Sequence, residues 1–421
     1  MLYMNKKMLY TYVGVDVHKQ THTAYFMNCF YEKIGEISFS SIPSEFDAFY
    51  DKAKKFCLPG TTFAWGLEDV SLYGRTFAKF LLAKGELVKH VNSTLVAGER
   101  KSLNTTTHKT DSVDAQCAAR VLFSRFDEMP LARADDKYFV LKNMVTRYQA
   151  TVKMRVAFKN QLHGLLMDPY PSYQTLFPTL CSKSSLAFLD AYPTPHALHG
   201  ISVDELTDFL QKISKNKLGK AKAKQIITAI EKEKTSHLDY ESDYQFIIRS
   251  LIRQLHTCLA EVDIAHEQIV KFLNHFDYPL MTLKGVNAIT AARFIVEIGP
   301  IDRFPNAASL AKFAGISPIT YASGKQDNQH ADTRGNRKLN ELFFRLAIHQ
   351  AMPVGSNQVS FNPLFADYYQ KKVSEGKTKK QALKAVSRRL VNIIYSMMKN
   401  NEDYMNPPMN LPNKAQAPNS A

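Results

Sequence analysis

Four acidic residues stand where their carboxylates can converge on a divalent cation. Asp16 lies near the end of a predicted strand, and Glu68 ends another. Asp111 and Asp114 are three residues apart at the start of a predicted helix, which puts both on one face. Hard divalent cations prefer carboxylate oxygens, and two such ions polarise a scissile phosphate and stabilise its attacking and leaving oxygens. The four acids therefore predict metal-dependent chemistry on a phosphodiester.

Each acid alone also has an ordinary explanation. Asp111 suits the first turn of a helix, where an acid interacts favourably with the helix dipole. Glu68 suits an exposed strand end. Asp16 is flanked by β-branched residues of a strand that should be buried, and a buried carboxylate is costly unless a cation or hydrogen bonds offset its desolvation. The combination, rather than any one acid, supports a metal site.

A serine in a basic loop is the second chemical feature. Ser323 precedes Gly324, so its hydroxyl can sit on an uncrowded turn. A serine hydroxyl is a weak nucleophile until a base or a metal activates it, no His–Asp pair has the spacing of a hydrolase triad, and G-x-S-x-G is absent. From the residues alone, an ordinary Ser-Gly turn is the simpler interpretation. Cations suited to a phosphate follow it: Lys325, Arg334, Arg337 and Lys338.

Strands and helices alternate up to about residue 130. Runs of β-branched and aromatic residues between polar breaks predict strands, and capping residues and glycines mark the helix ends. The order predicts a mixed sheet flanked by helices, beginning with an antiparallel meander. The predicted strands are 9–17, 23–30, 33–40, 62–68 and 86–91, and the predicted helices are 44–56, 72–84 and, after a Ser/Thr/Asn/Lys loop, one from about residue 110.

The middle of the chain, about 135–276, loses the strand signal. A helix at 137–167 carries basic residues, and a Pro/Ser/Tyr-rich stretch at 169–200 predicts a loop-rich insertion. One interpretation is a helical spacer with a solvated basic face; the other is a coiled-coil arm that dimerises and lays its basic helix on nucleic acid. The heptad seam comprises Leu251, Leu255, Cys258, Val262, Ala265, Ile269 and Phe272.

The region 279–400 is predicted to be mostly helical. Within it, 283–299 predicts two helices joined by a tight glycine turn, a shape that presents backbone N–H groups to a phosphate. The Pro/Asn/Ala-rich residues 401–421 predict a disordered tail.

The net charge of +15 indicates a polyanionic partner. The segment 371–389 holds eight cations and one anion, a net charge of +7. No apolar run approaches the roughly 18 residues of a membrane span, and we expect no signal peptide. Five scattered cysteines without a C-x-x-C pair indicate a reducing cytosol and argue against zinc.

Several separated motifs together resemble one family. They are Gly14-Val-Asp-Val-His-Lys19, Gly66-Leu-Glu68, His108-Lys-Thr-Asp-Ser-Val-Asp-Ala115, and Ala314-Gly-Ile-Ser-Pro with Ser323-Gly324 and Gly335-Asn336. In this order they look like the DEDD transposases, bacterial insertion-sequence recombinases related to the Piv-type DNA invertases. The resemblance covers about 9–130 and 279–350, and the predicted strand order is that of ribonuclease-H-like nuclease domains.

The resemblance implies a mechanism that the bare sequence does not give. Asp16, Glu68, Asp111 and Asp114 would bind Mg²⁺, with Mn²⁺ as an alternative, in a RuvC-like domain, and Ser323 would attack DNA to form a phosphoserine intermediate. It also implies donor and target DNA, a structured bridge RNA, and a homo-oligomer that is a dimer or a dimer of dimers, acting in the bacterial cytoplasm at the nucleoid, with no membrane. The heptad seam would bring one protomer's acids to another's serine.

One residue departs from the family pattern, and a set of cations completes the expected site. Asn340 stands where the family usually has Arg, which puts one phosphate contact in doubt. The residues expected to contact nucleic acid are Lys19, Lys109, Lys142, Arg147, Arg155, Lys325, Arg334, Asn336, Arg337, Lys338, Lys379, Lys380 and Arg388.

The sequence thus predicts an α/β plus α protein. Its parts are a RuvC-like mixed-sheet domain at 1–130, a helical coiled-coil region at 131–278, a mostly helical transposase domain at 279–400, and the tail. The predicted function is Mg²⁺-dependent DNA cleavage and strand exchange. The alternatives are a Piv-like invertase, a RuvC-like nuclease that uses water as its nucleophile, and a non-enzymatic scaffold that binds nucleic acid.

Overall fold

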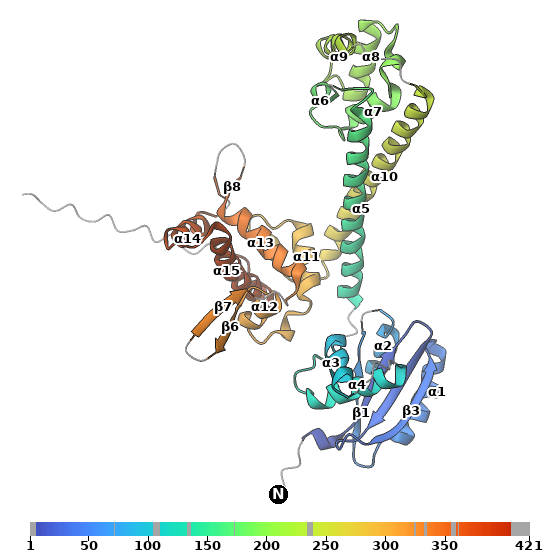
Figure 1. The fold of residues 1–421 in the computed structure, drawn as a ribbon, viewed down its shortest axis with the longest axis vertical. Helices are drawn as coiled ribbons and strands as arrows, with labels where there is room; N and C mark the ends of the chain where they lie inside the picture. Colours follow the sequence, from blue (N-terminus) through green and yellow to red (C-terminus); the bar gives the residue numbers. More distant parts are fainter. Residues whose placement is uncertain are drawn as a thin grey trace, which may run out of the picture. The chain divides into compact units, whose positions relative to one another are not determined.

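The chain forms two compact units, Met1–Phe139 and Val140–Ala421 (Figure 1). A computed structural model describes residues 6–70, 72–103, 110–132, 136–171, 173–233, 239–323, 326–331, 335–354, 359–360 and 362–405. The finer division at residues 130 and 278 stays a prediction.

The first unit is built on a five-stranded mixed sheet with the order β3-β2-β1-β4-β5. The first three strands are antiparallel, whereas β4 and β5 run parallel to β1. This confirms the expected mixed sheet and is consistent with a RuvC-like domain. The strands are β1 (Tyr10–Val17), β2 (Thr21–Met27), β3 (Lys33–Ser40), β4 (Thr62–Leu67) and β5 (Leu87–His90).

Helices cover both faces of this sheet. Side chains alternate along a strand, so Val13 and Val15 pack with α1 (Phe46–Ala53) and α2 (Arg75–Ala83) on one face. Tyr12 packs on the other face with α3 (Ser93–Leu103) and α4 (Asp111–Ser124). The polar stretch before residue 110 was expected to be a loop; Ser93–Leu103 is instead helical, because Val96 and its partly buried neighbours find a core to pack against. Short 3-10 turns are Lys6–Leu9, Pro43–Glu45 and Lys54–Phe56.

Gly14 lets strand β1 lie directly against α4. A Cβ atom at this position would stand 2.1 Å from the carbonyl oxygen of Ala115 and 2.2 Å from the backbone nitrogen of Ala119. These are backbone atoms of a buried helix, so they cannot swing aside. Only glycine allows the two elements to approach this closely, and this contact sets the height of α4 above the strand that carries Asp16.

We expect Gly14→Ala to destabilise the first unit by about 3 kcal/mol, because the added methyl group overlaps the helix backbone. Trp65 is the chain's one tryptophan and is fully buried in this unit, so its fluorescence during urea unfolding of the full chain reports the loss. The control is Gly98→Ala at an exposed position of α3, where no atom lies within 4 Å of the added methyl group. It should stabilise by about 0.5–1 kcal/mol, and equal effects of the two changes would contradict the packing argument.

The second unit begins with an apolar cluster at one end of two long helices. Leu162 and Leu166 of α5 (Asp136–Leu166) pack with Ile252 and Leu255 of α10 (Glu241–Leu273). The stretch 169–200 was expected to be loop-rich, yet it contributes helices and buried aromatic residues to this cluster. The connecting elements are α6 (Tyr173–Leu176), α7 (Lys183–Ala191), a 3-10 turn at Pro195–Leu198, α8 (Val203–Ser214) and α9 (Lys220–Glu233).

The predicted heptad seam is partly used inside the chain. Leu255, Cys258, Val262 and Ile269 are buried, and Leu255 packs in the cluster that holds the end of α5. The periodicity therefore identified part of the buried face of α10, and at this end that face packs into an apolar cluster of the same chain that includes α7. Dimerisation through the seam stays a prediction.

The rest of the second unit is mostly helical, as expected, with two short hairpins. Its elements are a 3-10 turn at Leu280–Thr282, α11 (Ala288–Ile298), a 3-10 turn at Ile301–Arg303, α12 (Ala307–Phe313), β6 (Pro318–Ser323), β7 (Gln326–Ala331), α13 (Arg337–Ala351), β8 (Pro353–Val354), β9 (Val359–Ser360), α14 (Pro363–Ser374) and α15 (Lys379–Asn400). None of the helices in the described part of the chain combines the length and the apolar character that crossing a bilayer requires.

The start of the predicted tail is packed onto the second unit. The backbone nitrogen of Tyr404 donates to Thr282 Oγ1 at 2.8 Å, and its hydroxyl accepts from Asn362 Nδ2 at 2.9 Å. The expectation of disorder was therefore wrong for 401–405, because an aromatic residue finds specific partners there. Residues 406–421 lie outside the described residues.

Candidate active site

Asp16 lies on the α4 side of the sheet. It stands two residues after Gly14 in β1, and alternate residues of a strand share a face, so its side chain points to the face that α4 covers. The residue is only 6% exposed. Burial raises the pKa of its carboxyl group, His18 lowers it, and the carboxylates of Asp114 and Asp111 raise it further. The net direction is upward, because burial and the two neighbouring acids together outweigh the interaction with His18.

The first turn of α4 supplies two more acids to the same region. Thr110 caps the helix, because its side-chain oxygen accepts from the backbone nitrogen of Val113 at 3.3 Å. This cap fixes the start of the helix, with Asp111 and Asp114 in its first turn. Asp114 is buried, whereas the side chain of Asp111 is more than half exposed. Asp111 belongs with Asp16 to one group of closely spaced ligand atoms, and the carboxylates of Asp111 and Asp114 both raise the pKa of Asp16.

A histidine that the sequence did not single out stands between two of these acids. His18 Nε2 lies 2.9 Å from Asp16 Oδ2 and 3.3 Å from Asp111 Oδ1. One ligand atom from each of the three residues lies within 4.8 Å of the others. One sequence feature could have identified His18. It stands two residues after Asp16 at the end of the strand, a spacing that returns a side chain to the same face.

Glu68 directly follows β4, the strand next to the one that carries Asp16. The parallel pairing of β1 with β4 places Val15 opposite Leu67, so Asp16, the next residue of β1, and Glu68, the first residue after β4, lie at the same end of these two strands. The backbone oxygen of Glu68 accepts from His90 Nε2 at 3.0 Å. In the described part of the chain, the compact ligand group holds Asp16, His18 and Asp111, and neither Glu68 nor Asp114 belongs to it. The four-acid ligand set therefore stays a prediction.

Asp114 is paired with a cation from the neighbouring helix. Arg100 Nη1 of α3 forms a salt bridge with its carboxylate. Both side chains are largely buried, so this ion pair is weakly screened. The same two helices hold a second pair of the same kind, Arg120 of α4 with Glu99 of α3, at 2.8 Å.

The residues present fit a divalent cation. Two carboxylate oxygens and an imidazole nitrogen lie within reach of one ion, and Asp16 carries a desolvated charge that a cation would neutralise. The exposed side of the group, at His18 and Asp111, leaves room for water or a phosphate oxygen to complete the coordination.

We expect Arg100→Met to tighten divalent-ion binding several-fold, because the guanidinium no longer competes for the Asp114 carboxylate and no longer repels a cation nearby. Isothermal titration of the full chain with Mn²⁺ measures this change. Arg120→Met removes the same charge from the same pair of helices without touching Asp114 and should change the affinity little. Weaker binding in Arg100→Met would mean instead that Arg100 orients Asp114 for the metal.

Ser323 closes a two-stranded hairpin. Antiparallel pairing of β6 with β7 runs from Pro318 opposite Ala331 to Ser323 opposite Gln326. The serine is therefore the last residue of its strand rather than part of a loose loop. Lys325 and Arg334, and also Lys109 of the first unit, lie outside the described residues.

A close backbone contact anchors the base of this hairpin. A Cβ atom at Gly335 would stand 2.3 Å from the backbone nitrogen of Gly315. Asn336 caps α13 by accepting from the backbone nitrogen of Leu339, and its Nδ2 donates to Glu297 Oε2 at 2.9 Å. Asn340 Nδ2 donates at 2.9 Å to the carbonyls of Ala314 and Gly315. Both asparagines thus hold the frame around the hairpin, and contact of Asn336 with nucleic acid stays a prediction.

The expected nucleic-acid contacts are mostly exposed where they are described. Lys19, Lys142, Arg147, Arg337, Lys338, Lys379 and Lys380 are exposed, and Arg155 and Arg388 are half-buried. Sequence analysis missed Lys384, which lies one turn from both Lys380 and Arg388 on α15. Its Nζ donates to Asn340 Oδ1, and burial together with Lys380 lowers its pKa. Lys380, Lys384 and Arg388 form a stripe, which we call the α15 stripe.

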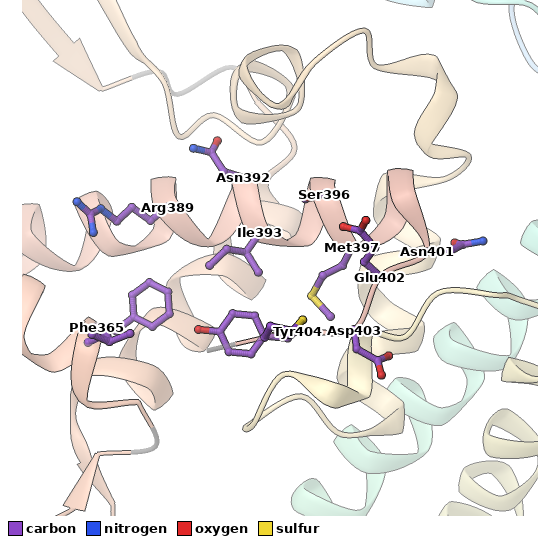
Figure 2. Close-up of a pocket in the computed structure, with 12 residues that line it drawn as sticks. Phe365, Arg389, Asn392, Ile393, Ser396, Met397, Asn401, Glu402, Asp403 and Tyr404 are labelled. Carbon is purple, nitrogen blue, oxygen red and sulfur yellow. The ribbon is translucent and has the colours of Figure 1, made fainter. Parts of the chain in front are cut away.

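An open cavity of about 1120 Å³ lies elsewhere in the second unit, between α14, α15 and 401–405 (Figure 2). Phe365, Ile393, Met397 and Tyr404 line it, with Arg389 at its edge. The Arg389 guanidinium lies 3.5 Å from the centre of the Tyr368 ring. None of the residues predicted from the sequence lines this cavity, which therefore adds nothing to the candidate active site.

Comparison with known proteins places this geometry in context. A family model described as transposase matches residues 13–171, and a model described as the transposase IS116/IS110/IS902 family matches residues 277–370. The chain is 25% identical to a protein of insertion element IS116 from Streptomyces clavuligerus, over 92% of this chain and 94% of that protein. It is 27% identical to a protein of IS110 from Streptomyces coelicolor, over 70% and 72%. A pilin gene-inverting protein of Moraxella bovis is 29% identical over 31% of this chain and 39% of its own length.

Proposed function

Because this chain belongs to the IS116/IS110/IS902 family of transposases, we propose that it cuts and rejoins DNA through a covalent phosphoserine intermediate. As a transposase it is a DNA-recombining enzyme, related in sequence to a gene-inverting protein. The proposal adds the chemistry: a divalent cation, Mg²⁺ or Mn²⁺, held at the N-terminal sheet, and Ser323 as the nucleophile.

The grouping of Asp16, His18 and Asp111 carries this proposal. A divalent cation bound there would polarise a phosphate oxygen and stabilise the charge that develops on the transferring phosphoryl group. Asp16 and Asp111 would hold the ion, with Asp114 and Glu68 completing the set from α4 and the end of β4. The desolvated charge of Asp16 supports this role, because a carboxylate buried beside other acids is stabilised when a cation joins it.

Ser323 would conserve the energy of the DNA bond. Its Oγ forms an ester with the phosphorus as the hydroxyl proton leaves, and the displaced deoxyribose oxygen takes up a proton. The reverse step, with a new DNA hydroxyl as nucleophile, rejoins the strand without an external energy source. Water as nucleophile would leave a break. The position of Ser323 at the end of β6, in a frame fixed by Asn336 and Asn340, supports a positioned nucleophile.

A guide RNA, donor and target DNA, and a dimer or dimer of dimers belong to the same proposal. The positive charge of the chain and the α15 stripe support two nucleic-acid partners. The likeness to a pilin gene-inverting protein, over 136 residues, favours site-specific inversion as a second candidate function, which would use the same residues.

We expect Ser323→Ala to abolish covalent protein–DNA adducts, because the ester cannot form. End-labelled DNA carrying the boundary of the element is incubated with the full chain, the RNA transcribed from its flank and Mg²⁺, and adducts are counted after denaturing electrophoresis. Ser374→Ala, an exposed serine of the same unit, is the control and should form adducts normally. Nicks without adducts in Ser323→Ala would point to water as nucleophile, and persisting adducts would exclude Ser323.

The α15 stripe should contribute to binding the DNA backbone. We expect Lys380→Gln to weaken duplex binding several-fold and to lower the slope of log Kd against log salt by about one, the value for one lost phosphate contact. Fluorescence anisotropy at several salt concentrations measures both quantities. Lys399→Gln is the matched control, because this lysine of the same helix is paired with Asp302 at 2.6 Å. The same slope for Lys380→Gln as for the unchanged protein would remove this residue from the interface.

A further inference from the structure

We infer that His18 is a direct ligand of the metal, and that its nitrogen makes the site select Mn²⁺ over Mg²⁺. The inference rests on the proposed function in that it assumes a divalent cation at Asp16 and Asp111. It adds a residue that the pattern of four acids does not contain, and it assigns that residue to the specificity of the site rather than to the transfer of the phosphate.

Geometry is the first support for this inference. His18 Nε2 lies close to one oxygen of each neighbouring acid, 2.9 Å from Asp16 and 3.3 Å from Asp111. A nitrogen near two carboxylate oxygens from different elements can share one ion with both of them after small side-chain movements. The three atoms already lie within 4.8 Å of one another.

The backbone around His18 holds the ring in this place. His18 follows the last residue of β1, and its backbone nitrogen donates to the carbonyl oxygen of Thr21 at 3.1 Å. That bond closes the turn from β1 into β2, so the residue is tied into the sheet rather than carried on a long loop. Its side chain is 47% exposed, which leaves a path for a hydrated ion.

The chemistry of the donor decides what the histidine adds. Mg²⁺ takes oxygen ligands in a strict octahedron and dehydrates reluctantly, so it gains little from an imidazole. First-row transition ions accept imidazole nitrogen readily, and selectivity among ions follows ligand type and geometry. A site made only of carboxylates would bind both ions as hard cations. Replacing one oxygen by the nitrogen of His18 shifts the balance toward Mn²⁺.

The competing explanation is that His18 is not a ligand and forms an ion pair with the two acids only while no metal is bound. A protonated imidazole between two carboxylates forms an ion pair that a metal would displace. The two roles predict opposite results. A ligand strengthens Mn²⁺ binding, whereas a histidine that only pairs with the acids competes with every divalent ion and forms no metal–nitrogen bond.

The test is electron spin echo envelope modulation of Mn²⁺ bound to the full chain, with titration calorimetry for Mn²⁺ and Mg²⁺. We expect ¹⁴N modulation of a directly bound imidazole in the unchanged protein and its loss in His18→Gln, which offers an amide oxygen at similar reach. His18→Gln should raise the Kd for Mn²⁺ by about tenfold and leave the Kd for Mg²⁺ within about twofold. Trp65 fluorescence confirms that the variant is folded.

Asp16→Asn separates this inference from the proposed function. Mn²⁺ that binds through Asp16 without nitrogen modulation, or His18→Gln that tightens both ions, would overturn the role of His18 and leave the metal site standing. Mn²⁺ binding that Asp16→Asn does not weaken would instead contradict the proposed metal site itself.

Discussion

The contact between Gly14 and the backbone of α4 is the constraint on which the candidate active site depends. Strand and helix lie so close that a single methyl group would overlap the carbonyl of Ala115. Asp114 directly precedes Ala115 in α4, Asp111 lies one turn before it, and Asp16 lies two residues after Gly14 in the strand. A looser packing would separate the carboxylates that raise the pKa of Asp16. The absence of a side chain at Gly14 thus allows the acids of β1 and α4 to lie close together.

A close backbone contact at glycine also lies near the hairpin of the second unit that carries Ser323. Gly335 meets Gly315 backbone to backbone, and Asn340 then bonds the two carbonyls at that crossing. Asn340 also accepts from Lys384, so a cation from α15 stands next to the frame. Lys384 thus brings positive charge from another helix next to Asn340, the position at which the resemblance implies an arginine.

The sequence predicted the sheet well, because alternation and turn residues are local signals. Strand β3 was predicted at its observed bounds, and the start of α4 followed from Thr110 and the two acids. The helix Ser93–Leu103 was missed because its exposed face is polar and because it packs mainly on α4, a contact between two elements that local sequence does not encode. The roles of His18, Arg100 and Lys384 were missed because each depends on a partner from another element or on the return of a turn. Of the three, only His18 had a local signal, its position two residues after Asp16, whereas the partners of Arg100 and Lys384 come from other helices and leave no local pattern.

The burial of Asp16 beside two other acids has a consequence for the stability of the first unit. Replacing a repelled, buried carboxylate removes electrostatic strain without removing any of the apolar packing around it. The acid that the proposed chemistry needs is thus one whose charge opposes the stability of the first unit.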